Sequence, residues 1–600
     1  MGQFNLIDEG WIPVIYKNSG ENKTLSIREI FQDADKIKSL STDSPTQDFA
    51  VLRILLAILQ TVYSRYDYES EIYPEIQLDE KFRQKEDIED SEELRDYKNN
   101  LIITWKKMWE NETFTQCLYD YLDNWHDRFF LFDEEYPFFQ VKASDITEDK
   151  IKPANASTVA GKNINRLISE SGNKVALFSP KFGDLDNQKI IQYQKSLKKE
   201  NKVLKLKSDF IKNLNWKDIL SSSEIARWLI TFQAYSGVSD KTKFIKLKYN
   251  STSKGWLFDL GGVYLEGENF FETLMLNLVL VHPQGNYSGK IQKPCWEYSS
   301  EELLREYMLS VDSKTGLRVE SLAQLYTIWS KAIFIDPKIN VDQPFYFKVV
   351  KLPDLEHQNQ FLETMTIWRY NKNGKNKGTF TPRKHQIGQS LWRNFGLISL
   401  KADDEDNSKA PGIIQWFELI KRIIGEDYRV SVKAISMQDD GNATSWVPVN
   451  EIYDTLNVKE DILTDLDDDG AVIRIENIVE QTKKAVGTYR TFINNIREIR
   501  NLESKKFVDD KVEEMYYLID QPFKDWISSI DSNEQIPDKI IEWRKELKTL
   551  ILNQADVILK QAGNRDYMGI EKNDKILNIA TAYSSFRHFL LKTLNIKEGA

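Results

Sequence analysis

The chain has 600 residues, a formal net charge of −11, and hydrophobic and aromatic contents of 41% and 12%. This length exceeds what one hydrophobic core usually supports, and the composition excludes a disordered chain. The acidic balance argues against a protein that binds nucleic acid through bulk charge alone.

The first 140 residues alternate between extended and helical patterns. Asp48–Tyr66 carries apolar residues at helical spacing and predicts a strong amphipathic helix. The aromatic segment 128–140 indicates core. Further predicted elements are an N-terminal strand or hairpin at 4–16, a short helix at Leu25–Phe31 capped by Ser26, and a second helix at 99–126.

Three polar or basic segments interrupt the middle of the chain. Residues 150–180 are rich in Gly, Asn and Lys, and a long polar loop inside a domain is usually functional or disordered. Residues 188–217 carry nine lysines against two acids, and 371–384 carry five basic residues and no acid. On an acidic chain such patches suggest local phosphate contacts within a larger assembly; solvated lysine-rich loops are the alternative.

The segment Val430–Tyr453 predicts a β-hairpin. Its first arm alternates, with Val430 and Val432 on one side and Ser431 and Lys433 on the other. The sequence Asp-Asp-Gly-Asn at 439–442 supplies residues that tolerate a positive φ, which a tight turn needs. A rigid hairpin can hold its tip in a groove that is too narrow for an α-helix.

Beyond residue 470 the apolar period becomes helical throughout. Four amphipathic stretches with short polar links predict an up-and-down four-helix bundle. We therefore expect an α+β protein, with a mixed α/β body at 1–455 and a C-terminal four-helix bundle at 456–600.

One stretch matches the EF-hand calcium loop. Residues 465–476 include Asp465, Asp467, Asp469 and Glu476, with Gly at the sixth position. EF-hands usually occur in pairs, and the sequence contains no second loop. The alternative is an acidic link whose aspartates cap the next helix.

Signals of catalysis or export are missing from the sequence. The N-terminus has no basic start with an apolar run, and no window of 18 apolar residues occurs, so we expect a cytoplasmic protein without a membrane span. Cys117 and Cys295 alone cannot form a Cys-based zinc site, and the histidines lack ligand spacing. No nucleophile-elbow, P-loop or dinucleotide motif is present.

Several segments resemble a known family. The string Phe4–Val14 (FNLIDEGWIPV) is similar to the N-terminal signature of CasA, the large subunit of the type I-E CRISPR surveillance complex Cascade. Further similarity is found at 127–140, 161–179, 391–393 and 513–527. The resemblance covers both ends and much of the middle of the chain.

The resemblance implies a protein without a catalytic role of its own. The family recognises a short protospacer-adjacent motif in double-stranded DNA, helps to open the duplex and recruits a helicase-nuclease that destroys the target. It implies the other Cascade subunits and the guide CRISPR RNA as further partners. We expect no membrane partner and no cofactor apart from the calcium alternative above.

The resemblance also assigns candidate site residues. The family's wedge hairpin enters the minor groove, and its tip corresponds here to Gly441, Asn442, Ala443 and Thr444. The minor groove presents mainly acceptors and the guanine amino group, which an amide side chain can read. Further candidates for DNA contact are Lys351, Lys348, Ser236 and Gly237, and those for the 5′ handle of the guide RNA are Phe178, Asn163 and Asn165.

Two other classes of function stay open. The first is a metal-dependent hydrolase or nuclease whose carboxylates come together only in the fold, with the acidic runs 403–406 and 465–469 as its support. The second is a scaffold protein that makes no direct DNA contact.

Overall fold

The structure is a computed structural model that describes residues 2–146, 151–152, 161–163, 166–168, 175–177, 220–236, 243–244, 254–312, 315–342, 345–399, 408–425, 428–439, 448–467, 470–531, 535–572 and 574–597. The chain divides into two compact units. The first holds residues 1–385, 411–423 and 433–453, and the second holds 386–410, 424–432 and 454–600. The boundary expected at 455 lies beside the division at 453–454, whereas 386–410 and 424–432 join the second unit.

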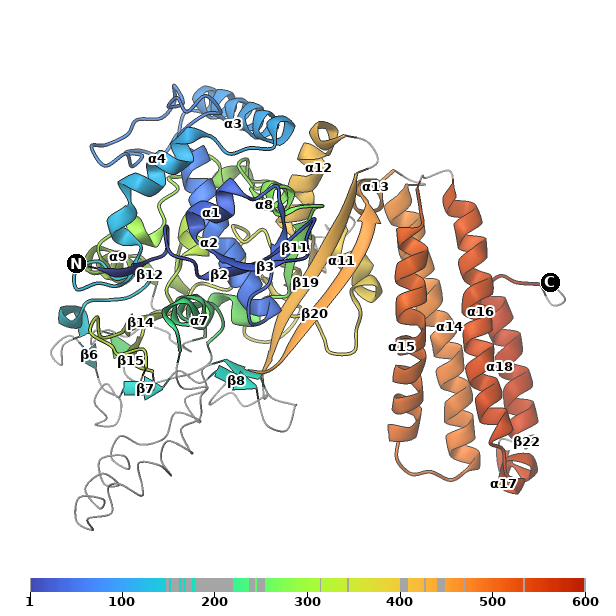
Figure 1. Ribbon diagram of the computed structural model, residues 1–600. Helices are drawn as coiled ribbons and strands as arrows, with labels where there is room; N and C mark the ends of the chain where they lie inside the picture. The colour runs from blue at the N-terminus through green and yellow to red at the C-terminus, as the bar shows by residue number, and fades with distance from the viewer. Residues whose placement is uncertain are drawn as a thin grey trace, which may run out of the picture. The chain divides into compact units, whose positions relative to one another are not determined.

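Helix α2 (Pro45–Tyr63) lies at the centre of the first unit (Figure 1). The helix predicted at Asp48–Tyr66 is confirmed, but its side chains are buried all round and not on one face only, because several other helices pack on it. The Ser44 side chain accepts a hydrogen bond from the Gln47 amide, and Pro45 occupies the first turn, so the helix start is locally specified. The helices that pack on it are α4 (Gln116–Asn124), α7 (Ser222–Tyr235), α8 (Phe270–Asn277) and α10 (Leu322–Tyr326).

Two arginines, Arg53 within α2 and Arg65 just after its C-terminus, are buried as ion pairs. Arg53 donates two hydrogen bonds to Glu363, of 2.9 and 2.8 Å, and Arg65 pairs with Glu297 at 2.8 Å. Burying a charge without a partner costs several kcal/mol, so these carboxylates are required once α2 is enclosed. They join α2 to segments that lie more than 200 residues further along the chain.

Several small sheets surround this helical core. The N-terminal strands form the order β3-β2-β4, and β1 pairs with β5. A five-stranded sheet has the order β14-β15-β10-β6, with β7 also pairing with β15. The bounds are β1 Gln3–Asn5, β2 Ile12–Tyr16, β3 Asn22–Leu25, β4 Ile37–Leu40, β5 Phe130–Phe132, β6 Ile151–Lys152, β7 Gly161–Asn163, β8 Arg166–Ile168, β9 Val175–Leu177, β10 Lys243–Phe244, β12 Val311–Asp312, β13 Gly316–Leu317, β14 Lys331–Phe334 and β15 Tyr346–Lys351.

The helix expected at 99–126 is wrong in its extent. Helix α3 (Ser91–Asn111) stops where Glu112 adopts a left-handed conformation with φ 50°, and α4 begins only at Gln116. The short helix capped by Ser26 is confirmed as α1 (Ile27–Gln32), with Glu29 completing a capping box. The remaining helices of this unit are α9 (Ser300–Ser310) and α12 (Gly412–Ile424).

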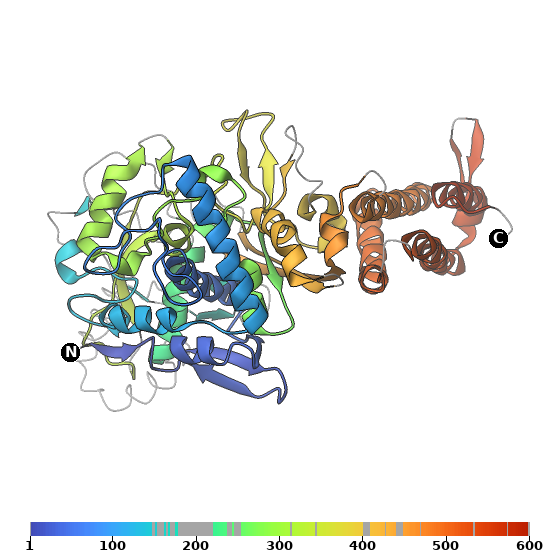
Figure 2. The ribbon, with the colours of Figure 1, turned by 90° about the horizontal axis from the view of Figure 1, so that it is seen from above.

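Four long helices dominate the second unit, as predicted. They are α14 (Ala471–Ile499), α15 (Lys506–Ser528), α16 (Ile536–Lys560) and α18 (Ile579–Thr593), and they lie side by side in both views (Figures 1 and 2). The last helix starts later than the apolar pattern suggests, because Ile576 lies in a short hairpin and is 64% exposed. The smaller elements are α11 (Phe395–Ile398), α13 (Glu460–Thr464), α17 (Asn564–Met568), β21 (Ile570–Lys572) and β22 (Lys575–Leu577).

Trp392 explains why 386–410 belongs to the second unit. Its ring stacks on Phe523 of α15 with centroids 4.2 Å apart, and its indole nitrogen donates to Asp520 at 2.9 Å. The neighbouring Arg393 lies over the ring of Tyr516, 3.5 Å from its centroid. An aromatic side chain buried in this way ties its whole segment to α15.

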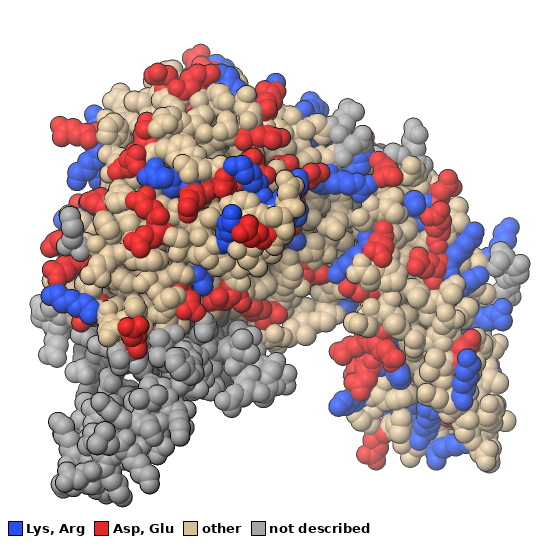
Figure 3. Space-filling view, viewed as in Figure 1, with Lys and Arg blue, Asp and Glu red and all other residues tan. Residues whose placement is uncertain are grey.

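Acidic and basic side chains are interspersed over the face shown in Figure 3. Within the described part of the chain, no helix combines the length and the apolar character that a membrane span requires.

Candidate nucleic-acid interface

The predicted hairpin is present as two long strands. Strand β19 (Arg429–Asp439) and strand β20 (Pro448–Lys459) pair in a sheet of order β11-β19-β20, with β11 formed by Gly262–Glu266. The turn between them, with the candidates Gly441, Asn442, Ala443 and Thr444, lies outside the described residues.

The residues of β19 alternate between two sides of the strand, but the side chains on both sides are buried. Val432 and Ser436 are fully buried on one side, and Ile435 and Met437 are also buried on the other. The burial of both sets of side chains means that protein covers both faces of β19, and as the middle strand of its sheet β19 is also hydrogen-bonded along both edges. A strand enclosed in this way is firmly held up to the point where the turn begins.

Hydrogen bonds fasten β19 to two other segments of the first unit. The Ser436 hydroxyl donates to the carbonyl of Leu260 at 2.7 Å and accepts from the His385 amide at 3.1 Å. The His385 ring donates from Nε2 to the carbonyl of Gly262 at 2.9 Å. These contacts fix the position of β19 just before the turn.

A charged cluster lies at the end of β19. Lys384 contacts Asp439 at 2.9 Å and Asp259 at 3.7 Å. Lys254 lies 2.5 Å from the same Asp259 carboxylate, and the His357 ring lies 3.5 Å from it. Burial alone would raise the pKa of Asp259, but His357 and the two lysines outweigh it, so this pKa lies well below its usual range.

Sequence reasoning missed this cluster, and no local signal could have revealed it. Its members come from residues 254, 259, 357, 384 and 439, which become neighbours only in the fold. The basic patches found in the sequence consist of residues that are close together in the chain. This cluster instead combines positively and negatively charged residues from separate segments.

The two candidate lysines of β15 lie in the five-stranded sheet. Lys351 pairs with Lys331 of β14 on one side and with Lys243 of β10 on the other, while Lys348 pairs with Phe334 and Gly161. Lys351 is 7% exposed and is therefore a buried lysine, not a surface one. It presents little of its side chain to a ligand in this conformation.

Lys331 is the buried neighbour of Lys351. Its Nζ contacts the Ser236 hydroxyl and lies 5.2 Å from the centroid of the Phe232 ring. Burial and the charge of Lys351 lower the pKa of Lys331 to about 7. The candidate Ser236 is thus a buried partner of this lysine, and Gly237 lies outside the described residues.

The guide-RNA candidates are described only in part. Asn163 ends β7 and pairs with Tyr346 of β15, which places this segment against the five-stranded sheet. Asn165 and Phe178 lie outside the described residues.

The EF-hand-like stretch begins with a helix cap. The Asp465 carboxylate accepts hydrogen bonds from the amides of Ala471 at 3.0 Å and Asp467 at 3.2 Å. The Glu476 carboxylate lies against Gly396 of α11. Asp469 lies outside the described residues, and within those that are described no three His, Cys, Asp or Glu side chains are grouped as a metal site.

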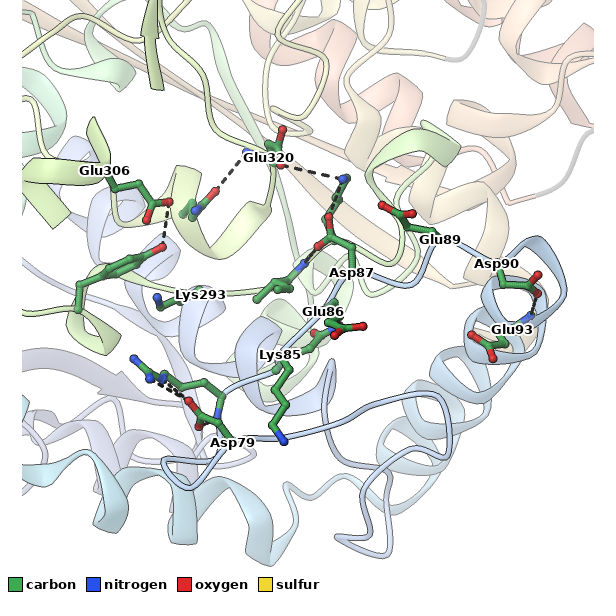
Figure 4. Close-up of a pocket in the computed structure, with 16 residues that line it drawn as sticks. Asp79, Lys85, Glu86, Asp87, Glu89, Asp90, Glu93, Lys293, Glu306 and Glu320 are labelled. Carbon is green, nitrogen blue, oxygen red and sulfur yellow. Dashed lines mark hydrogen bonds and ion pairs between the residues drawn. The ribbon is translucent and has the colours of Figure 1, made fainter. Parts of the chain in front are cut away.

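A cleft of about 990 Å³ in the first unit has the wrong charge for nucleic acid (Figure 4). Its lining includes eight carboxylates and four cations. Arg83 pairs with Asp79 at 2.8 Å and Lys290 with Asp87 at 2.6 Å, which leaves an acidic surplus that repels phosphate.

Comparison with known proteins gives one consistent family. A family model described as CRISPR-associated protein Cse1 matches residues 5–190 and 201–554. The CRISPR-associated protein CasA/Cse1 of Thermus thermophilus is 30% identical over 179 residues, which are 29% of this chain and 26% of that protein. The aligned segment therefore spans less than a third of either protein.

Two solved structures share the fold along nearly the whole chain. The crystal structure of Thermobifida fusca Cse1 has a TM-score of 0.68 at 21% identity, covering 99% of this chain and 98% of that one. A chain of a CRISPR RNA-guided surveillance complex has a TM-score of 0.59 at 14% identity, covering 98% and 99%. The α+β fold with C-terminal helices is thus the fold of these proteins.

Proposed function

The chain belongs to the family of CRISPR-associated protein Cse1, and on this premise we propose that it is the large subunit of a type I-E Cascade complex. In this role it recognises the protospacer-adjacent motif of double-stranded DNA through the minor groove and promotes strand opening, so that the guide RNA can pair. It also recruits the helicase-nuclease. The related chain from a CRISPR RNA-guided surveillance complex supports the assignment to such an assembly.

The hairpin β19–β20 is the observation that carries this proposal. Its strands have 11 and 12 residues, and hydrogen bonds from Ser436 and His385 hold β19 near the turn. An α-helix is about 10–12 Å across, whereas the minor groove is about 6 Å wide, so a hairpin turn enters where a helix cannot. Because β19 is held firmly next to the turn, the turn can press against the base pairs of the DNA without moving away.

Asn442 is the side chain that we assign to base contact. Its amide both donates and accepts, which matches the acceptors of the minor groove and the guanine amino group. Inserting side chains between base steps unstacks them at a cost of a few kcal/mol, which contacts to the opened duplex must offset.

The guide RNA and the other Cascade subunits are the remaining partners in this proposal. We assign Phe178 to stacking on a base of the 5′ handle and Asn163 and Asn165 to polar contacts with it, since unpaired RNA is commonly held by aromatic stacking. The chain itself has no catalytic role in this scheme and needs no cofactor.

The test compares two DNA substrates bound by the assembled complex. Asn442→Ala combined with Gly441→Asp is expected to weaken binding to an intact duplex target and to spare a target whose strands are already separated. A gel-shift titration of both substrates measures the difference.

A matched control is available in the exposed turn between β2 and β3. Asn18→Ala with Gly20→Asp makes the same two changes at a hairpin turn of the same unit. It is expected to leave both affinities unchanged. Equal loss on intact and opened targets for the Asn442 variant would contradict a wedge.

A further inference from the structure

Each strand of the hairpin β19–β20 carries a charged side chain that attaches it to another element of the first unit. On β19, the Lys433 ammonium lies 3.0 Å from the carboxylate of Glu266 on β11 and donates to the Tyr453 hydroxyl at 3.1 Å. On β20, the Glu451 carboxylate accepts a hydrogen bond from the Thr46 hydroxyl in the first turn of α2. The two strands are thus fastened to two different elements, β11 and α2.

These contacts lie on one face of the sheet. Side chains two residues apart on a strand point to the same side, which places Glu451 with Tyr453. Lys433 contacts Tyr453 and Glu266 from the strand between them, and β11, β19 and β20 lie next to one another (Figure 1). The exposed fractions of the Lys433 and Glu266 side chains are 10% and 15%. Solvent therefore screens this ion pair only weakly.

Glu451 lies where a carboxylate favours the start of α2. The first amides of a helix have no partners within the helix, and they give this end a partial positive charge. The Ser44 side chain accepts from the Gln47 amide, and Glu451 brings a second acceptor to the same turn from a strand about 400 residues further along the chain. A hydrogen bond and the helix dipole both draw β20 towards α2.

Asp48 brings a competing negative charge to the same place. It lies in the first turn of α2 and accepts hydrogen bonds from the Thr42 hydroxyl at 2.7 Å and the Thr42 amide at 2.9 Å. Burial, and then the charges of Glu451 and Glu266, raise the pKa of Asp48 to about 6. Burial also raises the pKa of Glu451. Two like charges therefore repel each other where β20 is attached, and a proton on Asp48 relieves that repulsion.

The other ionisable groups around Asp48 come from the three strands and from α7. They are Tyr264 and Glu266 of β11, Lys433 of β19, Glu451 and Tyr453 of β20, and Arg227 of α7 with its partner Asp43. The lysine and the arginine of this set each pair with a carboxylate, at 3.0 and 3.5 Å. Asp48 and Glu451 form no ion pair with any residue that the structure describes. Within that part of the chain, the proton on Asp48 is what neutralises this site.

We propose that Glu451 and Lys433 are positioning residues of the hairpin β19–β20, and that protonation of Asp48 controls how firmly Glu451 holds β20 against α2. The consequence for DNA rests on the proposed function, because a hairpin that opens a duplex must stay in place under load. The folded state binds the proton of Asp48 more tightly than the unfolded chain does. The attachment is therefore firmest below about pH 6 and weakens as the pH rises through that value.

The attachment is measured first in the free full chain, by hydrogen exchange of peptides from residues 448–459. Glu451→Ala removes the acceptor for Thr46, and exchange of these amides is expected to be about 10-fold faster than in the parent at the same pH. Glu451→Gln keeps an acceptor oxygen and is expected to exchange no faster than the parent. Lys433→Met is expected to speed exchange as well, because it leaves Glu266 without its cation.

Asp48→Asn tests the role of the proton. Asparagine keeps an oxygen that accepts from Thr42 but cannot ionise. In the parent, exchange of 448–459, corrected for the intrinsic effect of pH on amides, is expected to rise about 10-fold between about pH 5 and pH 7.5. In Asp48→Asn it is expected to stay at its low level throughout. A loss of protection in Asp48→Asn that is equal at every pH would show a packing role instead and would overturn the regulation.

The consequence for DNA is measured with the assembled complex, as the ratio of its affinities for an intact and an opened target. Glu451→Ala is expected to lower this ratio about 10-fold, whereas Asp48→Asn should match the parent at about pH 5.5 and exceed it at about pH 7.5. Glu21→Ala is the matched control, since it removes an exposed carboxylate beside another hairpin of the same unit. It is expected to change neither the exchange nor the ratio.

Failure of this proposal differs from failure of the proposed function. Unchanged exchange in Glu451→Ala, or exchange in the parent that does not respond to pH, would overturn the proposal. It would also be overturned if the parent discriminates between the two targets and Glu451→Ala keeps that ratio. If the parent binds both targets equally while its exchange responds to Glu451→Ala and to pH, the attachment stands and the role of the hairpin in strand opening fails.

Discussion

Lys384 donates a hydrogen bond of 2.9 Å to Asp439, and this contact joins the segment after β17 (Phe380–Pro382) to the end of β19. Both side chains are about four-fifths enclosed, with exposed fractions of 24% and 19%. The pair therefore connects residues 380–384 to the hairpin β19–β20 at a point where solvent screens the charges only in part.

The effects of substituting Lys384 and Asp439 on the free energy of unfolding are expected to be strongly coupled. Lys384→Met and Asp439→Asn should each lower the free energy of unfolding by about 1–2 kcal/mol, because each leaves a partly enclosed partner behind. The double variant should cost little more than either single one. Urea unfolding of the three variants measures the coupling, and strictly additive losses would contradict it.

Asp259 is expected to make stability depend on acid pH. Its pKa is lower in the folded state than in the unfolded chain, so its contribution is present above about pH 4 and is lost as the pH falls through the folded value. Asp259→Asn should therefore destabilise the protein by about 2–3 kcal/mol at pH 7. Thermal melts of both proteins should converge towards acid pH, and a constant difference would count against this role.

Local patterns predicted much of this fold. The apolar period of the C-terminal helices depends on residues three and four apart, and the Ser26–Glu29 capping box lies within a single turn. The β-forming residues on either side of the polar turn sequence predicted the two strands β19 and β20. In each case neighbours in the chain carry the signal.

The features that the sequence could not reveal depend on contacts between residues that are far apart in the chain. The parallel pairing of Lys243 with Lys351 joins strands about a hundred residues apart in the chain, and nothing in the neighbouring sequence indicates that Lys351 is buried. The cluster around Asp259 has the same origin. For the candidate site, the local sequence pattern predicted the hairpin. It did not predict the distant residues that contact β19 next to the turn.

Lys331 is expected to weaken the fold below neutral pH. Its pKa is about 7 in the folded state and near 10.5 when exposed, so the unfolded chain binds its proton more tightly. The resulting cost is fully present below pH 7 and disappears as the pH rises towards 10.5.

Lys331→Met removes that cost and should stabilise the protein by a few kcal/mol, roughly 2–4, at pH 6. The gain should shrink steadily between pH 7 and pH 10, as followed by chemical denaturation. A gain that does not vary with pH would point to packing alone, and a loss of stability at pH 6 would contradict the prediction.

Asp465 is expected to act as a helix cap. Its carboxylate accepts hydrogen bonds from the amides of Asp467 and Ala471 ahead of α14, so Asp465→Ala should cost about 1 kcal/mol. Thermal shift measurements in millimolar calcium and in chelator should give the same midpoint for the parent. A rise with calcium that disappears in the variant Asp465→Ala with Asp467→Ala would instead establish a calcium site.

Gly261 is expected to control the position of the segment Arg383–His385, which contacts β19 through Lys384 and His385. A β-carbon at this residue would clash with the carbonyl oxygen of Arg383, the residue before Lys384. Gly261→Ala should therefore displace this segment, lower the free energy of unfolding by about 1–3 kcal/mol and weaken duplex binding. Gly487→Ala is the control, because Gly487 lies in α14 with open space around it and should gain about 0.5–1 kcal/mol. If Gly261→Ala is as stable as the parent and binds duplex equally well, the close approach of these two segments has no role in holding the site.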